Sequence, residues 1–200
     1  MEVKSHSMKC PGCGEPHGTT QNTCEYCGRP IIVSTFNSVA TMPVPMVGKY
    51  ANTYKKELEG SPESKELNTA IALCYLKLKL YDKALAAFEK AIEDNFDNSE
   101  TFFYAAVCLL GGKKAFLTQR ATIDKIQEYV NAALMIEPSK GIYHYFLAYI
   151  KYDYFERKFF NITPTWQDEL DAANTAGTPP SPFDIEQLYG VLGVERPVQL

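Results

Sequence analysis

Four cysteines near the start of the chain constrain its folding more than any other feature. They form two C-x2-C pairs, Cys10 with Cys13 and Cys24 with Cys27, and a glycine follows each pair. Two such turns facing each other can offer four thiolates at tetrahedral spacing, the arrangement that Zn²⁺ takes in a closed structural site. Glycine suits the position after each pair because the backbone there often needs a positive φ. The spacing therefore predicts one structural zinc ion bound by these four cysteines.

Three other roles for these cysteines compete with zinc. Disulfides would need an oxidising compartment, yet the residues before Cys10 are polar and charged and lack the apolar core of a signal peptide. A thioredoxin-type redox pair would not need a second C-x2-C motif. Iron stays open, because spacing alone does not distinguish it from zinc among four thiolates. His6 and His17 could also compete for a ligand position, although four thiolates already complete the site.

Residues 8–33 resemble a zinc ribbon built from two rubredoxin-like knuckles, on the strength of the segments MKCPGCG and CEYCG. The resemblance implies a small metal module, which we place at residues 1–36. Charged side chains cancel in this region, and a Zn(Cys)4 centre would add two negative charges. Because nucleic-acid affinity depends largely on Lys and Arg, we expect this ribbon to bind DNA or RNA poorly.

The rest of the composition fits a modest globular domain. Of the 200 residues, 46% are hydrophobic and 22% are charged, so the chain can bury a core and is not predicted to be disordered. No apolar run reaches the roughly 18 residues that a membrane span would need, so we expect none. Cys74 and Cys108 stand alone in helical patterns and are expected to be buried. With no signal peptide in view, we expect a cytoplasmic protein.

Beyond the ribbon the sequence predicts helices. Residues 37–46 contain Pro43 and Pro45 and few periodic apolar residues, so we interpret them as a linker. Apolar side chains at helical spacing from Val47 to Leu58 predict one amphipathic helix. We assign residues 47–200 to a single helical domain.

Residues 65–98 resemble a tetratricopeptide repeat, a helical hairpin of 34 residues. Its small and large packing positions hold Ala72, Ala84, Phe88 and Ala91. Asn68 and Phe96 stand where the family has Trp and Pro. Residues 99–138 resemble a second repeat with six extra residues centred on KKAFLTQR, and a third first helix begins near Lys140. The resemblance implies a mainly α fold of about three hairpins, with atypical helices covering both ends.

In this family the first helices line a concave groove that binds peptides. The matching positions of the second and third repeats hold Phe103, Tyr104, Val107, Tyr143, His144 and Leu147. We predict that these six residues bind a partner peptide or helix through apolar anchors. The Lys, Arg and Asn residues with which some relatives clamp a carboxylate are missing there. The alternative is that some of the six belong to the core of so small a domain.

An aromatic stretch follows the start of the third repeat. Nine of the nineteen residues from Ile142 to Phe160 are Tyr or Phe, and they do not keep to one stripe. Such a helix is either buried or covered by a partner. We expect truncation of Tyr143 to weaken partner binding and truncation of Tyr149 to weaken folding.

The sequence offers no constellation for catalysis. It contains no H-E-x-x-H, no glycine-rich phosphate loop and no nucleophile elbow. We therefore predict a non-enzymatic adaptor or structural subunit that binds protein partners within a larger assembly. Two alternatives stay open: a nucleic-acid-associated zinc-ribbon protein, and a thiol-based redox or metal-regulated switch.

Overall fold

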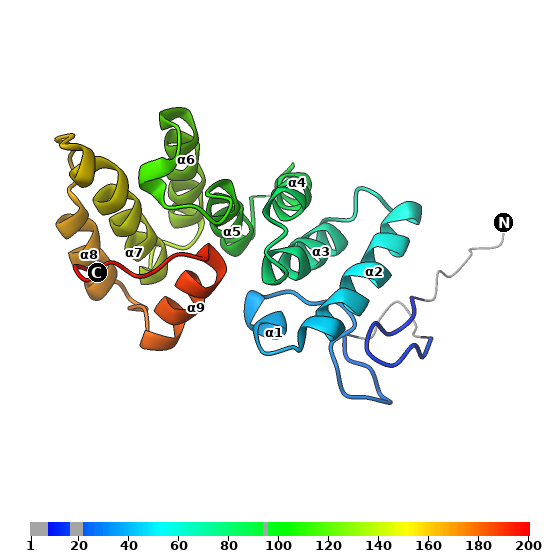
Figure 1. Cartoon of the computed structure of the whole chain (residues 1–200). Helices are drawn as coiled ribbons and strands as arrows, with labels where there is room; N and C mark the ends of the chain where they lie inside the picture. Colours follow the sequence, from blue (N-terminus) through cyan, green and yellow to red (C-terminus); the bar gives the residue numbers. More distant parts are fainter. Residues whose placement is uncertain (1–7, 17–21, 94–95) are drawn as a thin grey trace. The chain divides into compact units, whose positions relative to one another are not determined.

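Helices joined by turns make up most of the described chain, which comprises residues 8–16, 22–93 and 96–200 of a computed structural model (Figure 1). The contacts divide the chain into two compact units, Met1–Glu93 and Asp94–Leu200. The first unit contains the cysteine turns and helices α1 to α4, and the second contains α5 to α9. The all-α fold class predicted from the sequence is confirmed, with helices paired as in tetratricopeptide repeats.

The first unit is built around one helical hairpin. Its helices are α1 (Phe36–Ala40), α2 (Val44–Gly60), α3 (Lys65–Lys77) and α4 (Tyr81–Ile92). Helices α3 and α4 form the hairpin, and α2 packs against α3. Ala72, Ala84 and Phe88 are fully buried, as the repeat pattern predicts for positions where two helices approach closely. The side chain of Ser64 caps α3 by accepting a hydrogen bond from the Leu67 amide.

The segment expected to be a linker, residues 37–46, contains most of α1 and the start of α2. Phe36 and Val39 are buried, so burial of two apolar side chains holds this segment against the unit. Pro45 lies in the first turn of α2, where a missing amide hydrogen breaks no helical hydrogen bond. The prolines therefore mark the beginning of a helix here.

The second unit contains two further hairpins and a final helix. Its elements are α5 (Ser99–Leu109), η1 (Ala115–Leu117), α6 (Arg120–Ile136), α7 (Gly141–Ile150), η2 (Lys151–Phe155), η3 (Glu156–Lys158), α8 (Trp166–Thr175) and α9 (Pro182–Leu192). Helix α5 pairs with α6 and α7 pairs with α8, while α6 also contacts α7. The six extra residues of the second repeat lie in the turn between α5 and α6, where η1 forms.

Capping residues explain where the last two helices begin. Thr165 and Asp168 form a reciprocal capping box at the start of α8, and Ser181 and Asp184 form another at the start of α9. Gly193 ends α9 at a φ of 69°. Among the described residues, no helix is both long and apolar enough to cross a membrane.

Candidate metal centre and the face lined by the first helices

The two cysteine turns have the same backbone hydrogen bonds. In the first turn, the Cys10 amide donates to the Glu15 carbonyl at 2.7 Å and the Gly14 amide donates to the Cys10 carbonyl at 2.8 Å. In the second, Cys24 and Gly28 make the equivalent bonds, both at 2.8 Å. Gly14 and Gly28 have φ values of 86° and 67°, so the positive φ expected after each pair is present. The chain thus forms two copies of one knuckle.

The knuckles bring the four sulfur atoms together. The Sγ atoms of Cys10, Cys13, Cys24 and Cys27 all lie within 4.8 Å of one another. Cys10 Sγ lies 3.7 Å from Cys27 Sγ, and Cys13 Sγ lies 3.6 Å from Cys24 Sγ. A regular tetrahedron with metal–sulfur bonds of about 2.3 Å has edges of about 3.8 Å. The cluster therefore fits a single tetrahedral metal ion. His6 and His17 lie outside the described residues.

Electrostatics around the sulfurs favour thiolate at one position. Desolvation opposes the charged form of Cys24, but backbone N–H groups of Cys27 and Tyr26 and the thiols of Cys27 and Cys13 donate to its sulfur and lower its pKa to about 6. The amide of Glu15 favours the thiolate of Cys13, yet desolvation and the neighbouring thiols raise the pKa of Cys13 to about 12. A divalent cation at the centre would stabilise all four thiolates together. All four thiols are free of disulfides.

The cysteine cluster is joined to α2 through an extended arm. Ile31 is buried with Cys10 and Cys24 in a small core. From α2, the Tyr50 hydroxyl donates to the Pro30 carbonyl at 2.9 Å, and the Tyr54 hydroxyl donates to the Ile31 carbonyl at 2.9 Å. Both tyrosines are fully buried. Two aromatic side chains therefore fix the arm on a helix.

Most of the residues predicted to bind a partner are buried in the second unit. Phe103, Tyr104, Val107, Tyr143 and Leu147 are each exposed by 8% or less, and His144 is partly exposed. The rings of Phe103 and Tyr143 pack at a centroid distance of 4.7 Å, and the Tyr143 hydroxyl lies 2.8 Å from Ser99 Oγ. In this conformation the five buried side chains do not form an open surface.

Helix α9 covers the face that the first helices α5 and α7 line. It contacts α5, and its Tyr189 ring packs edge-on against Tyr145 and Tyr149 of α7 at 6.4 and 5.7 Å. Burial raises the pKa of Tyr104 well above its usual range, and the nearby carboxylates of Glu100 and of Asp184 from α9 add to the effect. This unit thus places a helix of its own on the face that the sequence predicts to bind a partner.

A buried charged cluster, which no sequence pattern predicted, joins α7 and η2 to α8. Glu169 accepts from Lys151 Nζ at 2.7 Å, and its other carboxylate oxygen lies 2.7 Å from His144 Nδ1. Lys151 also donates to the Pro164 carbonyl at 2.8 Å. The side chains of Lys151 and Glu169 are only 7% and 8% exposed. The one available signal was a lysine inside an apolar helical run, because buried lysine is rare without a partner.

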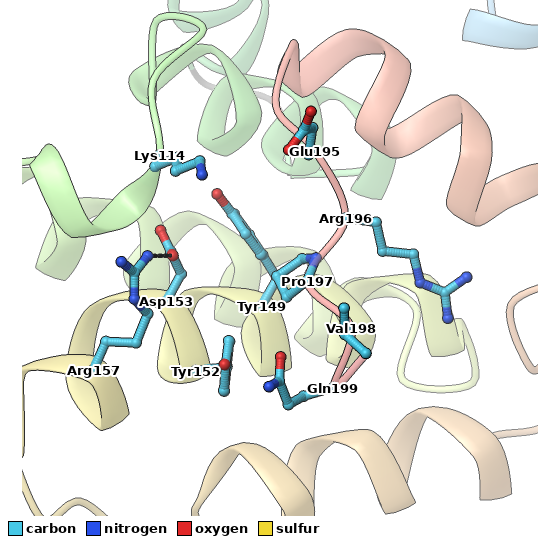
Figure 2. Close-up of a pocket in the computed structure, with 10 residues that line it drawn as sticks. All are labelled: Lys114, Tyr149, Tyr152, Asp153, Arg157, Glu195, Arg196, Pro197, Val198 and Gln199. Carbon is cyan, nitrogen blue, oxygen red and sulfur yellow. Dashed lines mark hydrogen bonds and ion pairs between the residues drawn. The ribbon is translucent and has the colours of Figure 1, made fainter.

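One pocket of about 270 Å³ lies between the end of α7, the loop before η1 and the segment 195–199 (Figure 2). Figure 2 shows Asp153 paired with Arg157 at its edge, with Lys114 and Glu195 on separate segments. The Phe116 amide also donates to Asp153, at 2.9 Å. The Asp153 carboxylate therefore binds both Arg157 and the Phe116 amide, and so holds two loops together.

The chain is similar to a structure described as MamA MSR-1 C2, with 16% sequence identity and a TM-score of 0.48, over 70% of this chain and 85% of that chain. No family model matches the chain. No curated protein matches it.

Proposed function

We propose that this protein is a non-enzymatic adaptor or structural subunit whose helical hairpins bind a helix or extended peptide of a protein partner. The proposed binding surface is the α5/α7 face, with the six residues predicted from the sequence. The partner would gain access by exchanging with α9. The proposal includes a cytoplasmic location, which suits a cluster of reduced thiols.

One observation carries this proposal: an amphipathic helix, α9, already lies on the α5/α7 face. Leu188 and Leu192 are buried on the side of α9 that faces the unit. Phe183, at the start of the same helix, is exposed. Helix-in-groove recognition uses this same arrangement, with apolar residues one turn apart as anchors. A face that accommodates one such helix within the chain has the shape and chemistry to accommodate another.

The cysteine cluster has a structural role in the proposal, with Zn²⁺ as its metal. Four thiolates leave no coordination position open for a substrate, so the ion would hold the two knuckles together and take no part in catalysis. Near the cluster, Lys9 and Arg29 are matched by Glu15 and Glu25, which supports a protein partner over a nucleic acid.

Site-specific photo-crosslinking tests the proposed surface. Tyr104 is replaced by benzoylphenylalanine in the full chain, which is expressed in its native cells and irradiated. The control carries the same group at Met135, which is 86% exposed on α6. We expect a partner protein to be crosslinked from position 104 and not from position 135.

A second variant tests the exchange with α9. Ser181→Ala removes the α9 capping box and should weaken the helix by about 0.5–2 kcal/mol. The yield of partner crosslinked from position 104 should then rise. Crosslinks from position 104 that reach only α9, in both backgrounds, would refute the proposed binding surface.

Metal analysis tests the proposed cofactor. The purified chain should contain close to one zinc ion, and Cys24→Ser should lose it because a structural site needs all four ligands. Cys74→Ser serves as the control, since Cys74 is buried away from the cluster. Iron in place of zinc, or disulfides among the four cysteines, would contradict this part of the proposal.

A further inference from the structure

Two loops of the second unit come together at one end of its hairpins. They are residues 113–120, which contain the extra residues of the second repeat, and residues 156–160, which follow α7. Arg157 and Lys158 lie over the Phe116 ring at 4.5 and 5.1 Å, and η1 contacts η2. We refer to these two loops together as the tip.

Large apolar side chains project from the tip into solvent. Phe159 is 93% exposed, Leu117 is 70% exposed and Phe160 is 48% exposed. They come from both loops, which the cation–ring contacts at Phe116 bring together, and we refer to these exposed apolar side chains of the tip as the apolar patch. Single exposed apolar residues are ordinary, whereas a group of them on adjacent loops indicates a contact surface.

The backbone at Phe159 strengthens this inference. Phe159 is one of two non-glycine residues in the described ranges with positive φ, at φ 58° and ψ 33°. A chain that ends a helix in this conformation usually has Gly or Asn there, because a bulky side chain is strained. The exposed Phe159 ring gains too little packing within the chain to offset that strain. Strain retained at an exposed aromatic residue points to a role outside the fold.

The tip is also cationic, in a chain whose formal net charge is −4. Its loops contain five Lys and Arg residues and one Glu. Arg120 and Arg157 form ion pairs with Asp124 and Asp153. Among the described residues, Lys113, Lys114 and Lys158 have no carboxylate partner within ion-pair distance. Three lysines without an acidic partner therefore lie on the same two loops as the exposed apolar side chains.

We propose that the tip binds the surface of an anionic lipid bilayer. Phe and Leu side chains on a protrusion can enter the boundary between headgroups and acyl chains, while lysines remain at the level of the anionic headgroups. Each lysine near such a surface adds a favourable electrostatic contribution. The exposed apolar side chains lie in short connecting segments between α-helices, which suits shallow insertion. This binding would be peripheral, and it goes beyond the proposed adaptor function.

Vesicle flotation of the full chain tests this proposal. The probes are phosphatidylcholine vesicles with and without 30% phosphatidylserine, at low salt and at high salt. We expect the wild type to float with the anionic vesicles only, and less at high salt because salt screens the lysines. The variant Leu117→Gln/Phe159→Asn should lower the partition coefficient by about tenfold or more. Asn tolerates a positive φ, so this variant should melt no lower than the wild type.

Matched variants separate the tip from general surface effects. Met135→Gln removes an apolar side chain that is 86% exposed on α6 and should leave flotation unchanged. Lys113→Gln/Lys158→Gln should reduce flotation with anionic vesicles, whereas Lys55→Gln/Lys56→Gln on α2 should not. Equal partition of the wild type and Leu117→Gln/Phe159→Asn would overturn the proposal. So would a wild type that binds no vesicles but loses a protein partner through the tip substitutions, which would make the tip a protein-docking surface.

Discussion

At the residue scale, the fold depends on a few side chains and glycines at positions where other residues would be strained or would clash. The knuckle glycines and the four cysteines were predictable, because their spacing and the need for positive φ are local properties. Gly141 was not predictable in this way. A Cβ there would lie 2.5 Å from the Ala173 carbonyl oxygen and 2.9 Å from the Thr178 carbonyl oxygen. That close approach exists only once α7 has met α8 and the loop after it.

We predict that Gly141→Ala destabilises the protein by about 1–3 kcal/mol, because backbone atoms must move to admit the methyl group. Gly190→Ala is the matched control, since a Cβ at Gly190 in α9 meets nothing within 4 Å. The control should be neutral or slightly stabilising, because Ala favours helix more than Gly. Chemical denaturation of both variants measures the difference. Equal effects would show that Gly141 is not tightly enclosed.

The structure changes the outcome expected for Tyr143. Both Tyr143 and Tyr149 are buried, at 0% and 1% exposure. We now predict that each alanine substitution lowers the free energy of unfolding by about 3–5 kcal/mol, as large aromatic truncations in a core do. Met135→Ala, at an exposed position, should change it by less than about 0.5 kcal/mol. Thermal melts that leave Tyr143→Ala unchanged would contradict this prediction.

At the element scale, helix pairing follows from sequence patterns, whereas buried charges hold particular pairs together. The hairpin α3/α4 matches the repeat predicted at residues 65–98, and local capping boxes begin α8 and α9. Residues 37–46, predicted to be a linker, contain most of α1 and the start of α2, because two prolines are compatible with both a linker and a helix start. The Lys151–Glu169 ion pair was also not predicted from the sequence, because the two residues lie 18 positions apart and meet only in the folded α7/α8 hairpin.

We predict that Glu169→Ala costs about 3–5 kcal/mol of stability, because it leaves the Lys151 ammonium buried without its carboxylate. Glu128→Ala breaks an exposed pair with Lys125 and should cost less than about 1 kcal/mol. Lys151→Met/Glu169→Leu should recover much of the loss, because neither charge is then buried. Denaturant titrations of the variants would test this. Similar losses for Glu169→Ala and Glu128→Ala would count against a stabilising buried pair.

At the scale of the whole molecule, the chain consists of two units, and the cysteine cluster belongs to the first. The division into residues 1–36, 37–46 and 47–200 stays a prediction. Within the first unit, the arm behind the cluster is hydrogen-bonded to Tyr50 and Tyr54 of α2. Removal of a bound metal should therefore lower the local stability of α2. The hairpins of the second unit have their own packing and should keep their stability.

We predict that chelation loosens residues 8–33 and lowers the protection of the α2 amides, because the arm loses its anchor. The far-UV circular dichroism signal should keep most of its helical intensity. Amide hydrogen exchange in α5 and α6 should not change. Hydrogen exchange followed by mass spectrometry, with and without chelator, resolves these segments. Collapse of the whole helical signal would show that the metal supports both units.

The sequence by itself determined the metal knuckles, the helical class and the hairpin boundaries, because these depend on residue spacing, caps and periodicity within short stretches. Tertiary structure alone decided that Phe103, Tyr104 and Tyr143 are covered. Phe103 and Tyr143 pack on each other where α5 meets α7, and Tyr104 lies near Asp184 of α9. The repeat pattern of α5 and α7 contains no information about a helix that lies far along the chain. Phe159 shows the opposite case: its place in an aromatic run predicted burial or cover by a partner, and its fold leaves it exposed.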